Sequence, residues 1–402
     1  MKYGKKTILF FFVNLLFCNN VSSCNLDVYL NKSKTYKSYR LEQEEGLLNN
    51  NSIISSFLPE ISIGMGQYIN NDRGFVPLGK SSFYISASQL IFSGNSFIND
   101  EEKIEIESKW RELSFIKDKY DMLLKLYADI IQYEYINENI LLTNNRLKKN
   151  KEDYDKSQLD LKIGNLAKID LDVKLLNLLK LENTLKGLKD DLELLGYKIT
   201  ENYSIPPEDI SKIKSEDILS CKVMGYSKLL ERMQNNKLQK ADIDFDINNA
   251  ALFPSVYVSL GLTPKNEGTL RDLDLNKINY SGGISVSIPL SNMLKAIDNQ
   301  KQFAINVSKA RIEAEKDQKE LIMTKKDLLN KYEMLKRSIP VLKKEVDLKN
   351  KKMNYKFWLV KEKRESVLSY LDSQDELYEA EINLKKDERD LKYYQVYLDF
   401  IN

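Results

Sequence analysis

The chain contains no histidine among its 402 residues, and glycine and proline are scarce. Histidine is the commonest metal ligand and the commonest general acid or base in proteins. Its absence therefore weakens the case for a catalytic or metal-binding function. Fifteen glycines and eight prolines are few for this length, as expected of a mostly helical protein.

Sequence motifs of enzymes are also missing. There is no Gly-rich phosphate-binding loop, no pair of closely spaced cysteines and no nucleophile motif. Lysine and arginine number 61 against 59 acidic residues, so the net charge of +2 gives no general case for nucleic-acid binding. We therefore expect a protein that is not an enzyme, needs no cofactor and has no nucleic-acid partner.

The N-terminus resembles a targeting segment. Lysines precede an apolar run from Thr7 to Phe17, which is too short for an ordinary transmembrane helix. Val21-Ser22-Ser23-Cys24 follows and resembles a bacterial lipobox, which predicts a signal peptide over residues 1–23 and lipidation of Cys24. Ordinary signal cleavage beside an incidental cysteine is the alternative.

Lipidation of Cys24 would leave Cys221 as the single thiol of the mature chain. One cysteine cannot form an intrachain disulfide, so we expect no disulfide framework and a buried, unpaired Cys221.

Two neighbouring stretches in the second half of the chain alternate between apolar and small polar residues. This period of two predicts strands with one apolar and one small polar face. Each strand has roughly ten residues, enough to cross an outer membrane at a tilt. A half-buried hairpin of a soluble domain is the alternative. In the membrane interpretation the lipid-facing residues are Val256, Val258, Leu260, Ile284, Val286 and Ile288.

A similar pair of stretches occurs earlier, over residues 57–92, and a very long helical pattern follows each pair. From about Ser96 to Ile163 the chain has no proline or glycine, which at 1.5 Å per residue corresponds to roughly 100 Å of helix. The second pattern has a strict seven-residue repeat, which implies packing against other helices with a left-handed supercoil. An ordinary soluble coiled coil shares this periodicity. The repeat consists of Val307, Ala314, Leu321, Leu328, Leu335 and Leu342.

Both long helices are expected to turn back on themselves. Gly164-Asn165 can adopt the left-handed conformation that ends a helix, and a second break is expected between Val360 and Ser366. Gly196, followed by Pro206-Pro207, is expected to end the first returning helix. Pro340 lies inside the second long helical pattern, where proline kinks or breaks a helix.

These features together resemble the TolC family of outer-membrane efflux proteins. In that family a Leu-Pro pair, here Leu58-Pro59, enters a hairpin that closes before a long helix, and the whole arrangement occurs twice. Gly164 and Asp170 match the family's Val-Gly-Leu-x-x-x-Asp turn at the inner end of the tunnel. The resemblance covers nearly the whole mature chain, and its specificity lies in the order and doubling of the motifs.

The second turn departs from the family pattern. Residues 367–374 resemble the family's Val-Leu-Asp-Ala-Gln helix, but Lys363 stands where glycine is expected. Relatives with a closed tip have an arginine two residues later, which pairs with the aspartate matched to Asp170. Glu365 stands there in this chain, with Arg364 one residue earlier, so the family's salt-bridge gate is not expected in its usual form. The run from Lys361 to Glu365 is equally explained as a solvated turn.

The resemblance implies a mainly α protein with membrane β-structure, in which four strands per chain contribute to a trimeric 12-stranded barrel. It implies a passive exit duct of an efflux or type I secretion system in the bacterial outer membrane, with periplasmic helices, a periplasmic adaptor and an inner-membrane transporter as partners. A structural coiled-coil envelope lipoprotein without transport activity is the alternative from another class. The expected tip and adaptor-contact residues are Gly164, Asn165, Leu166, Ala167, Asp170, Lys363, Arg364 and Glu365.

The expected organisation follows the chain in eight segments. They are a signal peptide (1–23), an N-terminal segment with a rising helix (24–56), a first hairpin (57–92), a first helical hairpin (93–196), a mixed linker (197–224), a second rising helix (225–252), a second hairpin (253–290) and a second helical hairpin (291–402).

Overall fold

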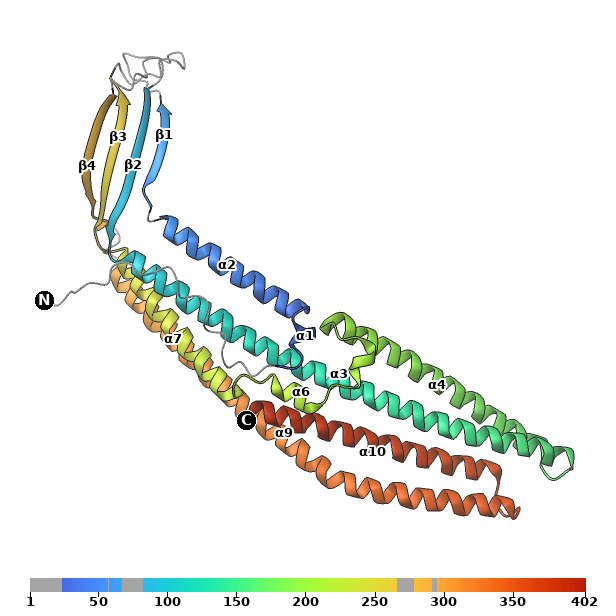
Figure 1. Cartoon of the computed structure of the whole chain (residues 1–402). Coiled ribbons are helices and arrows are strands. Elements are labelled where there is room, and N and C mark those ends of the chain that lie inside the picture. Colours follow the sequence, from blue (N-terminus) through green and yellow to red (C-terminus); the bar gives the residue numbers. More distant parts are fainter. Residues whose placement is uncertain (1–23, 57, 67–81, 266–277, 291–294) are drawn as a thin grey trace, which may run out of the picture. The chain divides into compact units, whose positions relative to one another are not determined.

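The computed structural model describes residues 24–56, 58–66, 82–265, 278–290 and 295–402 (Figure 1). The expected signal peptide, residues 1–23, lies outside these ranges. The chain forms two compact units. One comprises Met1–Lys37, Ile116–Leu229 and Lys319–Asn402, and the other comprises Ser38–Phe115 and Leu230–Gln318.

Four long helices form two helical hairpins, as the sequence predicts. The first hairpin consists of α3 (Ser96–Lys162) and α4 (Lys168–Tyr203), and the second of α9 (Ala296–Lys361) and α10 (Val367–Ile401). The seven-residue repeat of α9 faces inward. Leu328 packs with Leu398 and Ile401 of α10, and Leu321 packs against the same cluster, so this part of the repeat contacts α10.

Shorter helices precede the strands and fill the linker. The N-terminal helices are α1 (Asp27–Leu30) and α2 (Lys34–Ser56), and α7 (Tyr226–Ala250) precedes the second hairpin. The linker contains α5 (Pro207–Ile210) and α6 (Ser215–Ser220). Within the described residues, no helix combines the length and the apolar character needed to cross a membrane.

The expectation that Gly196 ends the returning helix is wrong, because α4 continues to Tyr203. Gly196 is buried inside α4 and lies next to the ring of Tyr133 on α3. The helix ends at Ser204, which adopts the left-handed conformation and donates its backbone N–H to Thr200 O. Extended Pro206 follows and prevents continuation of the helix.

Pro340 does not break α9, which is continuous from Ala296 to Lys361. A proline inside a helix removes one backbone hydrogen bond and costs about 3 kcal/mol. Leu335 and Ile339 on the adjoining turn are buried, and Ser338 Oγ donates a hydrogen bond to Asp387 of α10 at 2.7 Å. These contacts with the neighbouring helices offset the lost backbone bond.

The four strands form one antiparallel sheet in the order β1-β2-β3-β4 (Figure 1). They are β1 (Glu60–Gly66), β2 (Ser82–Ser93), β3 (Ser255–Pro264) and β4 (Ile278–Ser287). Both predicted hairpins are confirmed. The pairing of β2 with β3 joins the two copies, with an irregularity between Leu90 and Phe92.

The expectation of an unpaired Cys221 is wrong, because the structure joins Cys24 to Cys221 in a disulfide. The lipobox resemblance assigned the Cys24 sulfur to a lipid and so left Cys221 without an expected partner. Both arrangements use the same sulfur atom, so a lipid thioether at Cys24 and this disulfide exclude each other. Lipidation of Cys24 stays a prediction of the sequence.

Tyr120 of α3 holds the end of the linker against the helices. Its ring is fully buried and lies edge-on to Phe400, with the ring centroids 5.3 Å apart. Its hydroxyl donates to Met224 O at 2.7 Å and accepts from the backbone N–H groups of Val223 and Met224 at 2.8 and 2.7 Å. One side chain therefore satisfies three backbone groups where the linker meets α7.

We expect Tyr120→Phe to keep the ring contact and to leave those three backbone groups without their partner. An unsatisfied buried polar group costs about 1–3 kcal/mol, so the midpoint of thermal unfolding should fall measurably. Tyr197→Phe is the control, because the Tyr197 side chain is exposed. Equal midpoints for the two variants would contradict the anchoring role of the Tyr120 hydroxyl.

Candidate functional site

The register of β3 and β4 decides which residues share a face. Val256 lies opposite Val286, and Val258 lies opposite Ile284. Residues directly opposite in an antiparallel pair project to the same side of the sheet. The predicted apolar residues of these two strands therefore lie on one face, with Leu260 opposite Gly282 extending it.

The same face continues across β1 and β2. Ile63 lies opposite Ile85, Ile61 lies opposite Ala87, and Ala87 in turn lies opposite Leu260 of β3. We call the combined surface the apolar face of the sheet. It includes Ile61, Ile63, Met65, Phe83, Ile85, Ala87, Val256, Val258, Leu260, Leu262, Ile284 and Val286, and the register also places Gln89, Phe92 and Tyr280 on it.

The opposite side of the sheet carries mostly serine and glycine. Ser62 and Ser86 are paired, and their hydroxyl oxygens lie 2.7 Å apart. We call this surface the small polar face. It includes Ser62, Gly64, Tyr84, Ser86, Ser88, Tyr257, Ser259, Gly261, Ser281, Gly283, Ser285 and Ser287, and the register also places Glu60 and Leu90 on it. Glu60, at the start of β1, is the one charged residue in the four described strands.

The apolar face of the single chain is largely exposed. Ile284 is 74% exposed and Val286 is 61% exposed, and Ile61 and Ile63 are both 70% exposed. A contiguous apolar surface of this kind marks contact with protein or lipid. Ile288, which the sequence places with this set, lies one residue beyond the end of β4 and is also exposed.

The two outer strands each have one unpaired edge within the described sheet. β1 pairs with β2 alone, and β4 pairs with β3 alone. An edge of this kind presents a row of unused N–H and C=O groups, which is a template for pairing with another strand. The sheet is thus incomplete on both sides.

The two turns at the ends of the helical hairpins are geometrically equivalent. In the first, Gly164 N–H donates to Leu161 O at 3.1 Å and Asn165 N–H donates to Asp160 O at 2.8 Å. This pattern is a Schellman motif, which satisfies the last carbonyls of a helix. Ala167 is extended and precedes α4.

The second turn repeats these bonds 199 positions later. Lys363 N–H donates to Val360 O at 3.0 Å, and Arg364 N–H donates to Leu359 O at 2.9 Å. Lys363 has φ of 59°, in the left-handed region that Gly164 occupies at 75°. Lys363 thus occupies in the second turn the backbone position that Gly164 occupies in the first.

The charges at the turns do not form the family's salt-bridge gate within one chain. Glu365 pairs with Lys356 of α9, at 3.9 Å. Asp170 lies in the first turn of α4, where a carboxylate favours the positive end of the helix dipole, and Arg364 is exposed. Among the described residues neither Asp170 nor Arg364 has an ion-pair partner within the 4.0 Å limit for an ion pair.

A polar seam lies between α3 and α10. We define it on α3 by Asn139, Thr143, Arg146 and Asn150, which follow one another at spacings of four, three and four. Thr143 is fully buried and its hydroxyl lies 2.7 Å from the hydroxyl of Tyr378. Arg146 forms an ion pair with Asp375 and places its guanidinium 4.9 Å from the centre of the Tyr378 ring.

Burial shifts the titration of groups along α10. It raises the pKa of Glu381, with the positive charges of Lys149 and Arg146 acting in the opposite direction. It also raises the pKa of Tyr370, whose hydroxyl accepts a hydrogen bond from Gln374 Nε2 at 2.6 Å. The side-chain oxygens of Asn139 and Gln374 are buried and have no hydrogen-bond partner among the described residues. The seam is therefore polar where a helical bundle ordinarily has apolar contacts.

No protein-family model matches the chain, and no curated protein matches it by sequence. Solved structures do match. The outer-membrane channel OprN superposes with a TM-score of 0.72 at 14% identity, over 93% of this chain and 87% of that chain. The Campylobacter jejuni outer membrane channel CmeC gives 0.73 at 14% identity, over 94% and 84%. The open state of the Neisseria gonorrhoeae outer membrane channel MtrE gives 0.68 at 13%, over 94% and 87%.

The chain has the fold of these outer-membrane channels. The resemblance to TolC-like proteins is thus confirmed at the level of the fold, together with the four-stranded antiparallel sheet and the two long helical hairpins. Agreement over more than nine-tenths of the chain covers both copies of the repeated design.

Sequence reasoning on this outer-membrane channel fold missed the polar seam. Its signal was present, because Asn139, Thr143 and Arg146 occupy spacings that apolar residues occupy earlier in α3. All predicted turn residues lie in or directly next to the two hairpin turns, which belong to one compact unit. The predicted strand residues other than Ile288 lie on the apolar face.

The left-handed conformation of Lys363 leads to a stability prediction. A residue with a Cβ in this region carries a cost of about 1–2 kcal/mol that glycine avoids. We expect Lys363→Gly to raise the stability by about 1 kcal/mol, somewhat less than that cost because glycine also gains freedom in the unfolded chain. Thermal unfolding of the purified protein would measure it.

Gly164→Ala is the matched control at the equivalent position of the first turn. It should lower the unfolding midpoint, because it introduces the same cost where glycine now avoids it. A neutral or destabilising Lys363→Gly together with a neutral Gly164→Ala would contradict the equivalence of the two turns.

Proposed function

We propose that three copies of this chain assemble into an exit duct in the bacterial outer membrane. The observation that carries the proposal is the sheet, which combines one apolar face, one small polar face and two unpaired edges. In a barrel wall the apolar face would contact lipid and the small polar face would line a water-filled lumen.

Strand number supports a trimer. Open sheet edges are not tolerated in the hydrocarbon core, since unpaired backbone groups cannot bond to water there. Bacterial outer-membrane barrels have eight strands or more, and one chain supplies four. Three chains would supply twelve, with β4 of one chain pairing with β1 of the next. Because serine and glycine are small, these residues would leave the lumen open.

The helices would extend the lumen as a periplasmic tunnel. The duct would be a passive, non-enzymatic conduit of a tripartite efflux or type I secretion system, and an inner-membrane transporter would supply the energy. The fold likeness to OprN, CmeC and MtrE, which are outer-membrane channels, supports this assignment.

The hairpin turns are the proposed contact with a periplasmic adaptor. Both turns belong to the same compact unit and end their helices without burying their own residues. Ile163 and Ile169, which flank the first turn, are each 68% exposed. The contact would comprise Gly164, Asn165, Leu166, Ala167, Asp170, Lys363, Arg364 and Glu365.

A structural coiled-coil lipoprotein would share the helical repeat. It would not require a sheet whose apolar face extends over four strands and stays exposed in the single chain. That face is costly in water and favourable in lipid, so the sheet favours the duct over the coiled-coil alternative.

We expect the detergent-solubilised protein to be a homotrimer, because closure alone satisfies both open edges of the sheet. Native mass spectrometry or light scattering with correction for detergent would give the number of chains per particle. A stable monomer that retains its strands would contradict the proposal.

A pair of neighbouring substitutions tests the two faces. Val286→Arg would place a charge in hydrocarbon at a cost of about 2–4 kcal/mol per site near the midplane, and symmetry would apply that cost three times. We expect loss of assembly or of membrane insertion, measured as the trimer recovered from outer membranes.

Ser287→Arg is the matched control, one residue away on the small polar face. Its charge would stay hydrated in the lumen, so the trimer should form at the level of the unmodified protein and its pore should become narrower or more anion-selective. If both arginine variants reduced the recovered trimer equally, the two faces would not differ in their contact with lipid and water, which would contradict the proposal.

A further inference from the structure

The first residues after the expected targeting segment are packed firmly against the protein. Leu26 and Leu30 are buried, and Asn25 Nδ2 donates a hydrogen bond to Asp217 of α6 at 2.9 Å. Asp27 N–H donates to Cys24 O at 3.0 Å, which starts the first helical turn directly at Cys24. The segment from Cys24 to Leu30 is therefore held by contacts with the rest of its compact unit.

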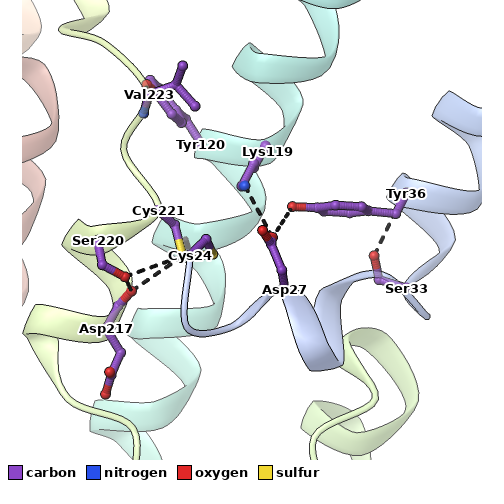
Figure 2. A network of polar contacts seen from close by, with 10 residues as sticks. All are labelled: Cys24, Asp27, Ser33, Tyr36, Lys119, Tyr120, Asp217, Ser220, Cys221 and Val223. Carbon is purple, nitrogen blue, oxygen red and sulfur yellow. Dashed lines mark hydrogen bonds and ion pairs between the residues drawn. A yellow bond between two sulfur atoms is a disulfide. The ribbon is translucent and has the colours of Figure 1, made fainter. Parts of the chain in front are cut away.

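Charged and hydroxyl groups fix the same segment from the other side (Figure 2). Asp27 accepts a hydrogen bond from Tyr36 OH at 2.8 Å and pairs with Lys119 of α3 at 3.3 Å. Tyr29 OH donates to Asp209 of the linker at 2.9 Å. These bonds join the N-terminal segment to α3 and to the linker within one compact unit.

Cys24 and Cys221 meet at the centre of these contacts. Cys24 is 6% exposed and Cys221, the residue that caps α6, is 2% exposed. The Cys221 sulfur lies 3.3 Å from the carbonyl oxygen of Asp217, as Figure 2 shows. The sulfur of Cys24 is thus bonded to a buried partner inside the protein, and it is not available for a thioether to a diacylglyceryl group.

We propose that the mature chain carries the Cys24–Cys221 disulfide in place of a lipid on Cys24. The disulfide covalently joins the segment before the first hairpin to the linker before the second, across 197 positions of the sequence. It therefore links the segments that precede the two repeats, each of which consists of a strand pair and a helical hairpin. This inference goes beyond the proposed duct and requires only export to an oxidising compartment.

The chemistry balances as thiol–disulfide exchange with a protein disulfide oxidant of the envelope. One thiolate of the pair attacks a sulfur of the oxidant's disulfide, and a mixed disulfide forms. The second thiolate then attacks the bonded cysteine sulfur and releases the oxidant as a dithiol. Cys24 and Cys221 together lose two protons and two electrons, which the oxidant gains. No acyl transfer to Cys24 takes place.

Mass and thiol measurements on the full chain test the inference. The protein would be extracted from outer membranes into detergent with an alkylating maleimide present from the start. We expect no label before reduction, two labels after reduction under denaturing conditions, and a gain of about 2 Da on reduction of unlabelled protein. The N-terminal peptide should include Cys24 without acyl chains.

Three results would overturn the inference. They are acyl chains on the N-terminal peptide with a single reactive thiol at Cys221, two thiols that react without reduction, or a mature chain that begins after Cys24. None of these depends on whether the protein is a trimer or a duct, so failure here is distinguishable from failure of the proposed function.

Single and double variants give an independent readout. We expect Cys24→Ser and Cys221→Ser to lower the unfolding midpoint by similar amounts, and the double variant to lower it no further, because the two residues act as one bond. In Cys221→Ser, Cys24 should also react with maleimide without reduction. A lipidated Cys24 would stay unreactive in that variant, and Cys221→Ser would leave the midpoint unchanged. Ser220→Ala is the control for substitution at the end of α6.

Discussion

Pairing of backbone groups at the sheet edges is the constraint on which the rest of this structure depends. Each chain supplies four strands whose outer edges are unpaired and whose apolar face is exposed. Hydrocarbon tolerates neither an open edge nor a charge on that face. In the proposed duct, pairing with other copies would close the edges, and the apolar face carries no charged residue. The near absence of charge from the strands and the serine and glycine of the opposite face are consistent with a wall between lipid and water.

Each pair of strands is followed by one long helix. α3 has 67 residues and α9 has 66, and neither can bury its apolar residues as a single helix. Each is therefore followed by a second helix that runs back along it, and the helices pack through their apolar repeats. Both turns use the same pair of capping bonds, and Lys363 adopts the conformation of Gly164 at an energetic cost. The same turn geometry therefore forms with lysine as it does with glycine.

Much of the fold was predictable from local periodicity. The period of two identified β3 and β4, the seven-residue repeat identified the inward face of α9, and Gly164 located the first turn. The misses involve contacts between distant segments. Gly196 indicated a helix end by composition, but it is buried inside α4 next to Tyr133. The Cys24–Cys221 pair spans 197 positions, and no local pattern reports such a contact.

The polar seam illustrates a different limit. Asn139 and Thr143 could have been noticed at helical spacing, but their burial depends on α10, whose partner residues lie more than 200 positions away. Similarly, local patterns do not determine the order of the strands, and the pairing of β2 with β3 became evident from the structure alone. Periodicity assigns a residue to a face, and tertiary structure decides what that face meets.

Cysteine labelling of adjacent residues in β4 tests the central claim most directly. Single cysteines at positions 286 and 287, in a chain whose Cys24 and Cys221 are alanine, would be exposed in outer membranes to a water-soluble reagent and to a lipid-phase reagent. The account predicts opposite preferences, with Val286→Cys reacting from lipid and Ser287→Cys reacting from water. Protection of position 286 from both reagents would mean that this face is buried against protein, and it would contradict the membrane barrel.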